Sequence, residues 1–124
     1  MSENYKTLFS SFKIKNVKLL NRLVMLPHVT FYGTQQRTPS DRHHHYYLER
    51  AKGGVGLIVT ESQYVHETSA VEHCVDASNR EGMMLWRRTV DAVHDYGTKM
   101  FGQITHHGIQ TFSAHTYLPS LSPS

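Results

Sequence analysis

Polar side chains that could bind a ligand or transfer a proton follow three short apolar runs of this sequence. The stretches LPHVT, TESQ and QITHHG begin at positions 26, 60 and 103. If the apolar runs are parallel strands, these stretches meet at one edge of a sheet, where ligands of α/β folds collect. Gln103 offers a donor and an acceptor on one planar amide, which suits the polar edge of a planar heterocycle. The alternative is that the Gln103 amide satisfies neighbouring backbone groups.

Other side chains in these stretches each allow a functional and a structural interpretation. Glu61 is a candidate acid or base, or a ligand for a ribose-like hydroxyl, and a solvated carboxylate at a strand end is equally consistent with the pattern. His28 could polarise a carbonyl or hold an anion, or it could pack at the end of its strand. His106 and His107 carry the same two interpretations.

The run His43-His44-His45 has the residue type of a metal site without its geometry. Successive helical residues point about 100° apart, so the three imidazoles cannot converge on one ion while the segment is helical. The motifs HExxH, GxxxxGKS and GxGxxG are absent from the sequence, and Cys74 is its single cysteine. We therefore expect neither a metal site nor a phosphate-binding loop.

The elements that must position these residues begin with a hairpin and continue with two helices. The hairpin is predicted over 9–20, where apolar residues alternate with polar ones. Ser40 is an N-cap candidate for a helix that runs from Asp41 to the glycines at 53–54. A second helix, with apolar residues at helical spacing, ends before Gly97.

Three runs have the pattern of short buried strands, and they lie at 22–26, 55–60 and 99–105. Strands that alternate with helices require crossover connections, which favour a parallel sheet with helices packed on it. Residues 22–105 are therefore predicted as a β-α-β-α-β unit. The segment 111–124 is rich in Ser, Thr and Pro and is predicted to be a loop.

The composition narrows the class of protein further. The 124 residues are 39% hydrophobic, and the 13 basic and 10 acidic residues are scattered along the chain. A protein without a basic stripe is not expected to bind nucleic acid, and one without a run of about 18 apolar residues is not expected to enter a membrane. The opening MSENYKT lacks the apolar core of a signal peptide, which predicts a cytoplasmic protein.

Four segments in a fixed order carry a family resemblance. They are LFSSFKIKNVKLLNRLVMLPHVT, YYLERAKGGVGLIVTES, VDAVHDYGTKMFGQITHHG and SLSPS. The second is similar to the pattern Y-x-x-R-A-x-G-G-x-G-L-I-x-x-E, and the third resembles V-H-x-x-G-x-x-x-x-x-Q-L-x-H-x-G-R. Together they resemble the N-terminal part of the old yellow enzyme family of FMN-dependent NADH:flavin oxidoreductases, over nearly the whole chain.

The resemblance implies an α/β fold, namely about three βα units and a leading hairpin from a TIM (β/α)8 barrel that holds FMN at the carboxyl ends of its strands. By position, Pro27 and His28 would contact the flavin largely through their backbone. Ser62 would lie beside the ring system, and Gln103 would bond to its pyrimidine edge. The Pro-His pair resembles the branch that contains trimethylamine dehydrogenase and dienoyl-CoA reductases more than it resembles plain ene-reductases.

Two positions depart from the family pattern. In the amine dehydrogenase a cysteine after Pro-His bonds the flavin covalently, whereas this chain has Val29, so noncovalent FMN is expected. Several relatives place a Thr or Cys side chain near the flavin carbonyl at this position, and that contact is lost here unless Thr30 supplies it. Ile109 stands where the family usually has Arg.

The implied activity is hydride transfer between NAD(P)H, FMN and a small-molecule substrate, either an activated alkene or an amine. The family's substrate-binding and proton-donating residues belong to later strands, so no catalytic residue is assigned in this chain. Three parallel strands cannot close an eight-stranded barrel. We therefore expect an incomplete N-terminal fragment that requires the remainder of the barrel or an oligomer partner. The alternative is a noncatalytic truncated product, or a module completed by a second chain.

Overall fold

The computed structural model describes residues 5–111 and 113–121. Its main elements follow the chain as a hairpin and a β-α-β-α-β unit, and short helical turns lie both between β4 and α2 and in the tail after β5. The hairpin and the unit comprise β1 (Phe12–Ile14), β2 (Val17–Leu19), β3 (Val24–Met25), α1 (Asp41–Lys52), β4 (Leu57–Tyr64), α2 (Arg80–Asp95) and β5 (Lys99–Thr105). The short helical turns are η2 (Glu67–Ser69), η3 (Gly108–Gln110) and α3 (Ser113–Thr116).

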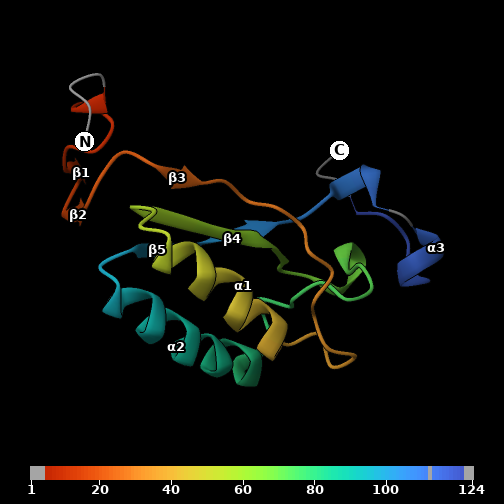
Figure 1. Ribbon diagram of the computed structural model, residues 1–124. Helices are drawn as coiled ribbons and strands as arrows, with labels where there is room; N and C mark the ends of the chain where they lie inside the picture. The colour runs from red at the N-terminus through yellow and green to blue at the C-terminus, as the bar shows by residue number, and fades with distance from the viewer. Residues whose placement is uncertain (1–4, 112, 122–124) are drawn as a thin grey trace.

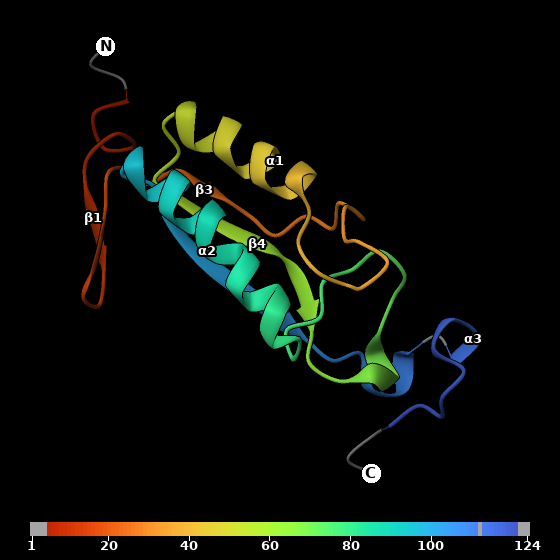
Figure 2. The same cartoon turned by 90° about the horizontal axis from the view of Figure 1, so that it is seen from below.

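The three strands of the unit form one parallel sheet in the order β3-β4-β5, and β1 and β2 pair separately as an antiparallel hairpin. Figures 1 and 2 show α1 and α2 side by side on the same face of the sheet. The strand order therefore advances in one direction while both helices stay on one face. That progression is typical of a (β/α) barrel, whereas a doubly wound sheet reverses its strand order.

The core lies between the sheet and the two helices. Its buried side chains come from both helices, from β4 and from the loop before α2: Tyr47, Ala51, Ile58, Val75, Trp86 and Val93. Burial of a large apolar side chain contributes about 1.5–3 kcal/mol, so this cluster is the main source of stability in the layer. The indole nitrogen of Trp86 donates to Gln63 Oε1 at 3.0 Å, which satisfies both buried polar groups.

The opposite face of the sheet has no covering layer among the described residues. Val24 on β3 is in register with Leu57 on β4, whereas the next pair, Met25 and Ile58, packs into the core. Because side chains alternate along a strand, Val24 and Leu26 point away from the helices. Both are exposed, and Leu26 is 71% accessible.

Ser40 and Gly97 lie at helix ends as the sequence predicts, whereas the N-cap of α2, Asn79, was not predicted and the first C-terminus differs in one residue. The backbone of Ser40 precedes α1 in extended conformation, and Asn79 caps α2 by accepting from the Gly82 amide at 3.0 Å. After α1 only Gly54 is left-handed, at φ +84°, while Gly53 stays near helical values. Gly97, at φ +76°, ends the second helix in the same way.

Three predicted boundaries differ from the structure. β3 is limited to Val24–Met25, and β4 continues past Thr60 to Tyr64 because its added residues pair with β5. In the predicted loop 111–124, Ser113–Thr116 form one helical turn. A single turn needs no hydrophobic periodicity, so the pattern could not reveal it. Residues 112 and 122–124 of that segment lie outside the described residues.

Candidate cofactor site

The carboxyl ends of β3, β4 and β5 bring the three predicted polar stretches to one edge of the sheet. The strands are parallel, and Ser62 on β4 is in register with Gln103 on β5. Registered residues of neighbouring parallel strands point to the same face, so these two side chains are neighbours. Pro27 and His28 follow β3 at the same edge.

A bulge in β4 decides which face Ser62 occupies. The register with β5 shifts between Val59 and Ser62, so one strand has an extra residue there. Glu61 and Gln63 contact α1 and α2 through His43 and Trp86. Ser62, which lies between them, therefore points to the open face of the sheet.

Gln103 presents its side-chain amide on this open face. It is exposed, and its backbone amide donates to Thr60 Oγ1 at 3.3 Å. Among residues 5–111 and 113–121, no hydrogen bond engages the side-chain amide. The interpretation that Gln103 satisfies neighbouring backbone groups is therefore not what the structure shows.

Pro27 and His28 lie in the segment that leads away from β3. Pro27 is half-buried and His28 is exposed, and the described part of the chain offers His28 no hydrogen-bond partner. In the segment 27–29, no backbone hydrogen bond is made outside the strand pairing. The imidazole is therefore accessible, whereas the structural interpretation placed it packed at the strand end.

Glu61 differs from both sequence-based interpretations. Its side chain is 0% exposed and points into the helix layer, so it is neither a solvated carboxylate nor a ligand-facing acid. The Thr30 amide and hydroxyl donate to its Oε2, each at 2.6 Å, and His43 Nε2 lies 2.7 Å from its Oε1. Burial raises the pKa of Glu61, but the hydrogen bonds from His43 and Thr30 outweigh it and hold the pKa below 4.5.

The hydrogen bonds to Glu61 also determine whether the Thr30 hydroxyl is available to a cofactor. This hydroxyl is committed to Glu61, on the helix side, so it does not replace the contact that relatives make from the position of Val29. Ile109, which stands where the family usually has Arg, lies in η3, and its side chain is exposed.

Sequence reasoning missed the Glu61 network because its members are up to 31 residues apart. One local signal was available. Ser40 and His43 occupy the first and last positions of a capping box, and His43 Nδ1 accepts from the Ser40 amide at 3.1 Å. That hydrogen bond orients the imidazole of His43, which is fully buried, toward the interior of the protein.

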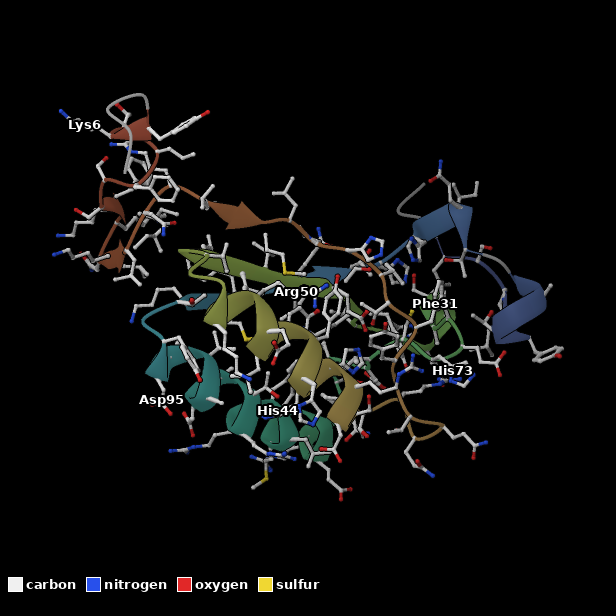
Figure 3. All side chains as sticks on the ribbon, in the orientation of Figure 1. Lys6, Phe31, His44, Arg50, His73 and Asp95 are labelled. Carbon is white, nitrogen blue, oxygen red and sulfur yellow. The ribbon has the colours of Figure 1, made fainter. Side chains whose placement is uncertain are left out.

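Of the other candidate histidines, His44 and His106 have side-chain partners, whereas His107 is exposed and bonds through its backbone amide, which donates to Ser69 Oγ at 2.6 Å. Figure 3 shows His44 on α1 facing the second helix, where its Nδ1 lies 3.2 Å from Thr89 Oγ1. Burial, followed by the charge of Arg88, lowers the pKa of His44 below 6.5. His106 Nε2 lies 3.1 Å from Thr68 Oγ1 and fastens the end of β5 to η2. Within the described ranges, no three potential ligand side chains group as a metal site.

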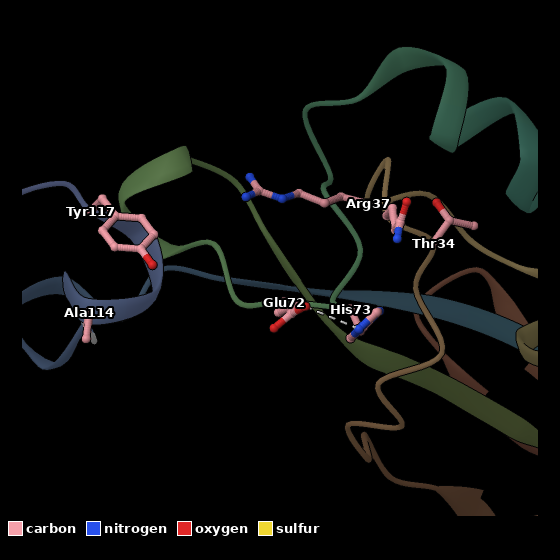
Figure 4. A pocket seen from close by; sticks show the side chains of 7 residues that line it. Thr34, Arg37, Glu72, His73, Ala114 and Tyr117 are labelled. Carbon is pink, nitrogen blue, oxygen red and sulfur yellow. Dashed lines mark ion pairs between the residues drawn. The ribbon is translucent and has the colours of Figure 1, made fainter.

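A separate pocket of about 300 Å³ lies between the loop after β3 and the tail, as Figure 4 shows. Its polar lining includes Arg37, Glu72, His73 and Tyr117, and the Glu72–His73 pair is 3.5 Å apart. None of the predicted cofactor residues lines it, so it is distinct from the edge at Ser62 and Gln103.

Fold and site together define a class: the first βα units of a parallel barrel with ligand-facing polar groups at the carboxyl edge of its strands. The model of the NADH:flavin oxidoreductase / NADH oxidase family matches residues 7–124. The chain belongs to this family, and the predicted membership is confirmed. In the described residues, no helix has the length and apolar character needed to cross a membrane.

Two relatives agree with this membership, and a solved structure has the same fold. An NADH oxidase from Thermoanaerobacter brockii is 36% identical, over 87% of this chain and 17% of its own length. An NADPH dehydrogenase from Listeria monocytogenes is 36% identical, over 82% of this chain and 30% of its own length. The old yellow enzyme homologue from Zymomonas mobilis superposes with a TM-score of 0.86 at 24% identity, over 95% of this chain and 33% of that chain.

These matches confirm the expected fold, part of a TIM barrel. The chain spans less than a third of the length of the two curated relatives. The narrower resemblance to the trimethylamine dehydrogenase and dienoyl-CoA reductase branch stays a prediction.

Proposed function

We propose that this chain supplies the N-terminal part of a noncovalent FMN site in an oxidoreductase of the NADH:flavin type. The reaction is hydride transfer between NAD(P)H, FMN and a small-molecule substrate, an activated alkene or an amine. The observation that carries the proposal is the accessible amide of Gln103, which has no hydrogen-bond partner among the described residues and lies beside Ser62 at the carboxyl edge.

The residues at this edge have the chemistry that a flavin requires. A primary amide donates and accepts in one plane, which matches the alternating polar atoms of a pyrimidine ring. Ser62 adds a hydroxyl on the same face, and the segment at Pro27 and His28 offers backbone groups that are not engaged outside the strand pairing. FMN supplies the redox chemistry when bound, while these residues bind and orient it. Val29 has no thiol, so no covalent bond to the flavin forms there.

The open face of the sheet favours a second candidate function, a module that is active only when another chain or segment completes it. Val24, Leu26 and Phe101 expose apolar surface where further strands of a barrel would pack. If the chain is such a module, FMN binds tightly only after another chain or segment supplies the missing strands of the barrel. A noncatalytic truncated product would bind none.

Titration of FMN into the purified chain, followed by quenching of flavin fluorescence, tests the proposal. Gln103→Leu removes the amide, and we expect it to weaken FMN binding about tenfold, since one lost hydrogen-bonded pair costs about 1–2 kcal/mol. Gln36→Leu makes the same change at an exposed position away from the edge and should leave the affinity unchanged.

The same titration is repeated on a chimera in which this chain replaces the matching segment of the Listeria NADPH dehydrogenase. Binding by the chimera but not by the chain supports the module. If neither binds FMN, or if Gln103→Leu and Gln36→Leu bind equally well, the proposed site is wrong.

A further inference from the structure

The network around Glu61 has a defined direction of hydrogen bonding. His43 Nδ1 accepts from the Ser40 amide at 3.1 Å, so the ring proton is assigned to Nε2, which donates to Glu61. Thr30 donates twice to the other carboxylate oxygen. The backbone amide of Glu61 donates to the Tyr47 hydroxyl at 2.8 Å. The carboxylate therefore acts only as an acceptor and has donors on both oxygens.

This network reaches the segment that follows β3, which has little else to hold it. β3 is only two residues long, and residues 27–29 make no backbone hydrogen bond outside the strand pairing. The next residue, Thr30, is held by a hydrogen bond, because its backbone amide donates to Glu61 Oε2. Two anchors, β3 and Glu61, thus set the path of the residues between them.

From this geometry we infer that Glu61, oriented by His43, is a positioning residue that fixes the segment 27–30 for contact with the cofactor. The inference rests on the proposed FMN site. Glu61 touches no cofactor itself, because it points into the helix layer. It acts by holding Thr30, and thereby sets where the backbone of Pro27 and His28 is presented at the edge of the sheet.

A pair of variants separates this role from a general contribution to the core. Glu61→Gln leaves one acceptor oxygen for donors on both sides, so an amide that accepts from Thr30 sets its nitrogen against the protonated Nε2 of His43, and the reverse orientation sets it against Thr30. Two donors cannot bond to each other, so the network loses one link. Adding His43→Gln places an amide oxygen near the former Nε2 and restores an acceptor. Glu67→Gln, an exposed carboxylate on η2, is the matched control.

Amide hydrogen exchange is measured for the full chain without FMN, and fluorescence titration then gives its FMN affinity. We expect Glu61→Gln to raise exchange at Thr30 at least tenfold relative to Ile58 in the core of β4, and to weaken FMN binding at least fivefold. The double variant should recover a substantial part of both changes. Glu67→Gln should match the wild type in both measurements.

Three results would overturn the inference. Exchange at Thr30 could stay at the wild-type rate in Glu61→Gln, or it could rise only in parallel with Ile58, which indicates general destabilisation. FMN affinity could also remain unchanged although Thr30 is loosened. If the wild type binds no FMN, the proposed function of the lone chain fails, and the exchange ratio still decides whether Glu61 orders the segment.

Discussion

At the scale of single residues, partners rather than residue type determine behaviour. Glu61 is a buried carboxylate with three strong donors, and its pKa lies below 4.5 because the hydrogen bonds from His43 and Thr30 overcome the effect of burial. Cys74 shows the opposite case. Burial, with a smaller contribution from the charge of Glu61, raises the pKa of its thiol to about 11.

The lowered pKa of Glu61 predicts a loss of stability in acid. A carboxyl group whose pKa is lower in the folded state stabilises the fold above its unfolded pKa, and this contribution disappears as the pH falls through the folded value. The free energy of unfolding should therefore decrease as the pH drops below about 4.5. Urea unfolding at a series of pH values from 3 to 6 measures how the free energy of unfolding depends on pH. Glu61→Gln should flatten this dependence, and the exposed Glu72→Gln should retain it.

The raised pKa of Cys74 predicts an unreactive thiol. At pH 8 about one thiol in a thousand is ionised if the pKa is about 11, and the side chain is only 7% exposed. A disulfide reagent such as DTNB should label the native chain slowly and the urea-unfolded chain at once. Rapid, complete labelling of the native chain would contradict the burial of Cys74.

At the scale of elements, close backbone contacts join the hairpin to the sheet. The Asn21 side-chain nitrogen Nδ2 donates to the Gly54 carbonyl at 2.7 Å, and its side-chain oxygen Oδ1 accepts from the Leu23 backbone amide at 3.0 Å. Gly56 lies so near that a Cβ there would be 2.6 Å from the Asn21 carbonyl oxygen. The joint before β4 therefore requires a residue without a side chain.

Gly56→Ala tests this joint. A methyl group cannot fit without moving the Asn21 backbone, and overpacking of this kind costs about 1–3 kcal/mol. We expect the free energy of unfolding to fall by that amount in chemical denaturation. Fluorescence of Trp86, the single tryptophan and a buried one, reports the transition. Gly102→Ala, where a Cβ would have only an ordinary contact 3.4 Å from Gln63 Nε2, should change stability by less than about 1 kcal/mol. Equal effects at both glycines would exclude the clash as the cause.

At the scale of the whole molecule, the sheet is covered on one face only. The helices pack against Ile58 and its neighbours, while the other face exposes Val24 and Leu26, and the outer edge of β5 is unpaired among the described strands. Exposed apolar patches and free strand edges promote association. The chain by itself should therefore self-associate at raised concentration.

Leu26→Lys tests the source of this association. A charge on the exposed apolar surface beside β3 should reduce light scattering and lower the average mass in sedimentation, with little effect on the unfolding transition. Met84→Lys, at a helix residue as exposed as Leu26 (74% against 71%), adds the same charge elsewhere and should behave like the wild type. A wild-type chain that stays monomeric with a cooperative melt at all concentrations would contradict this prediction.

The sequence by itself determined the order of the main elements and the family, because these depend on local periodicity and on motifs in a fixed order. The apolar runs indicated the parallel unit, and Ser40 and Gly97 marked helix ends that the structure has. The tertiary structure alone decided where Glu61 points. A bulge shifts the register between Val59 and Ser62, and it turns Glu61 toward the helices and Ser62 toward the open face. That choice depends on partners up to 31 residues away, which no local pattern encodes.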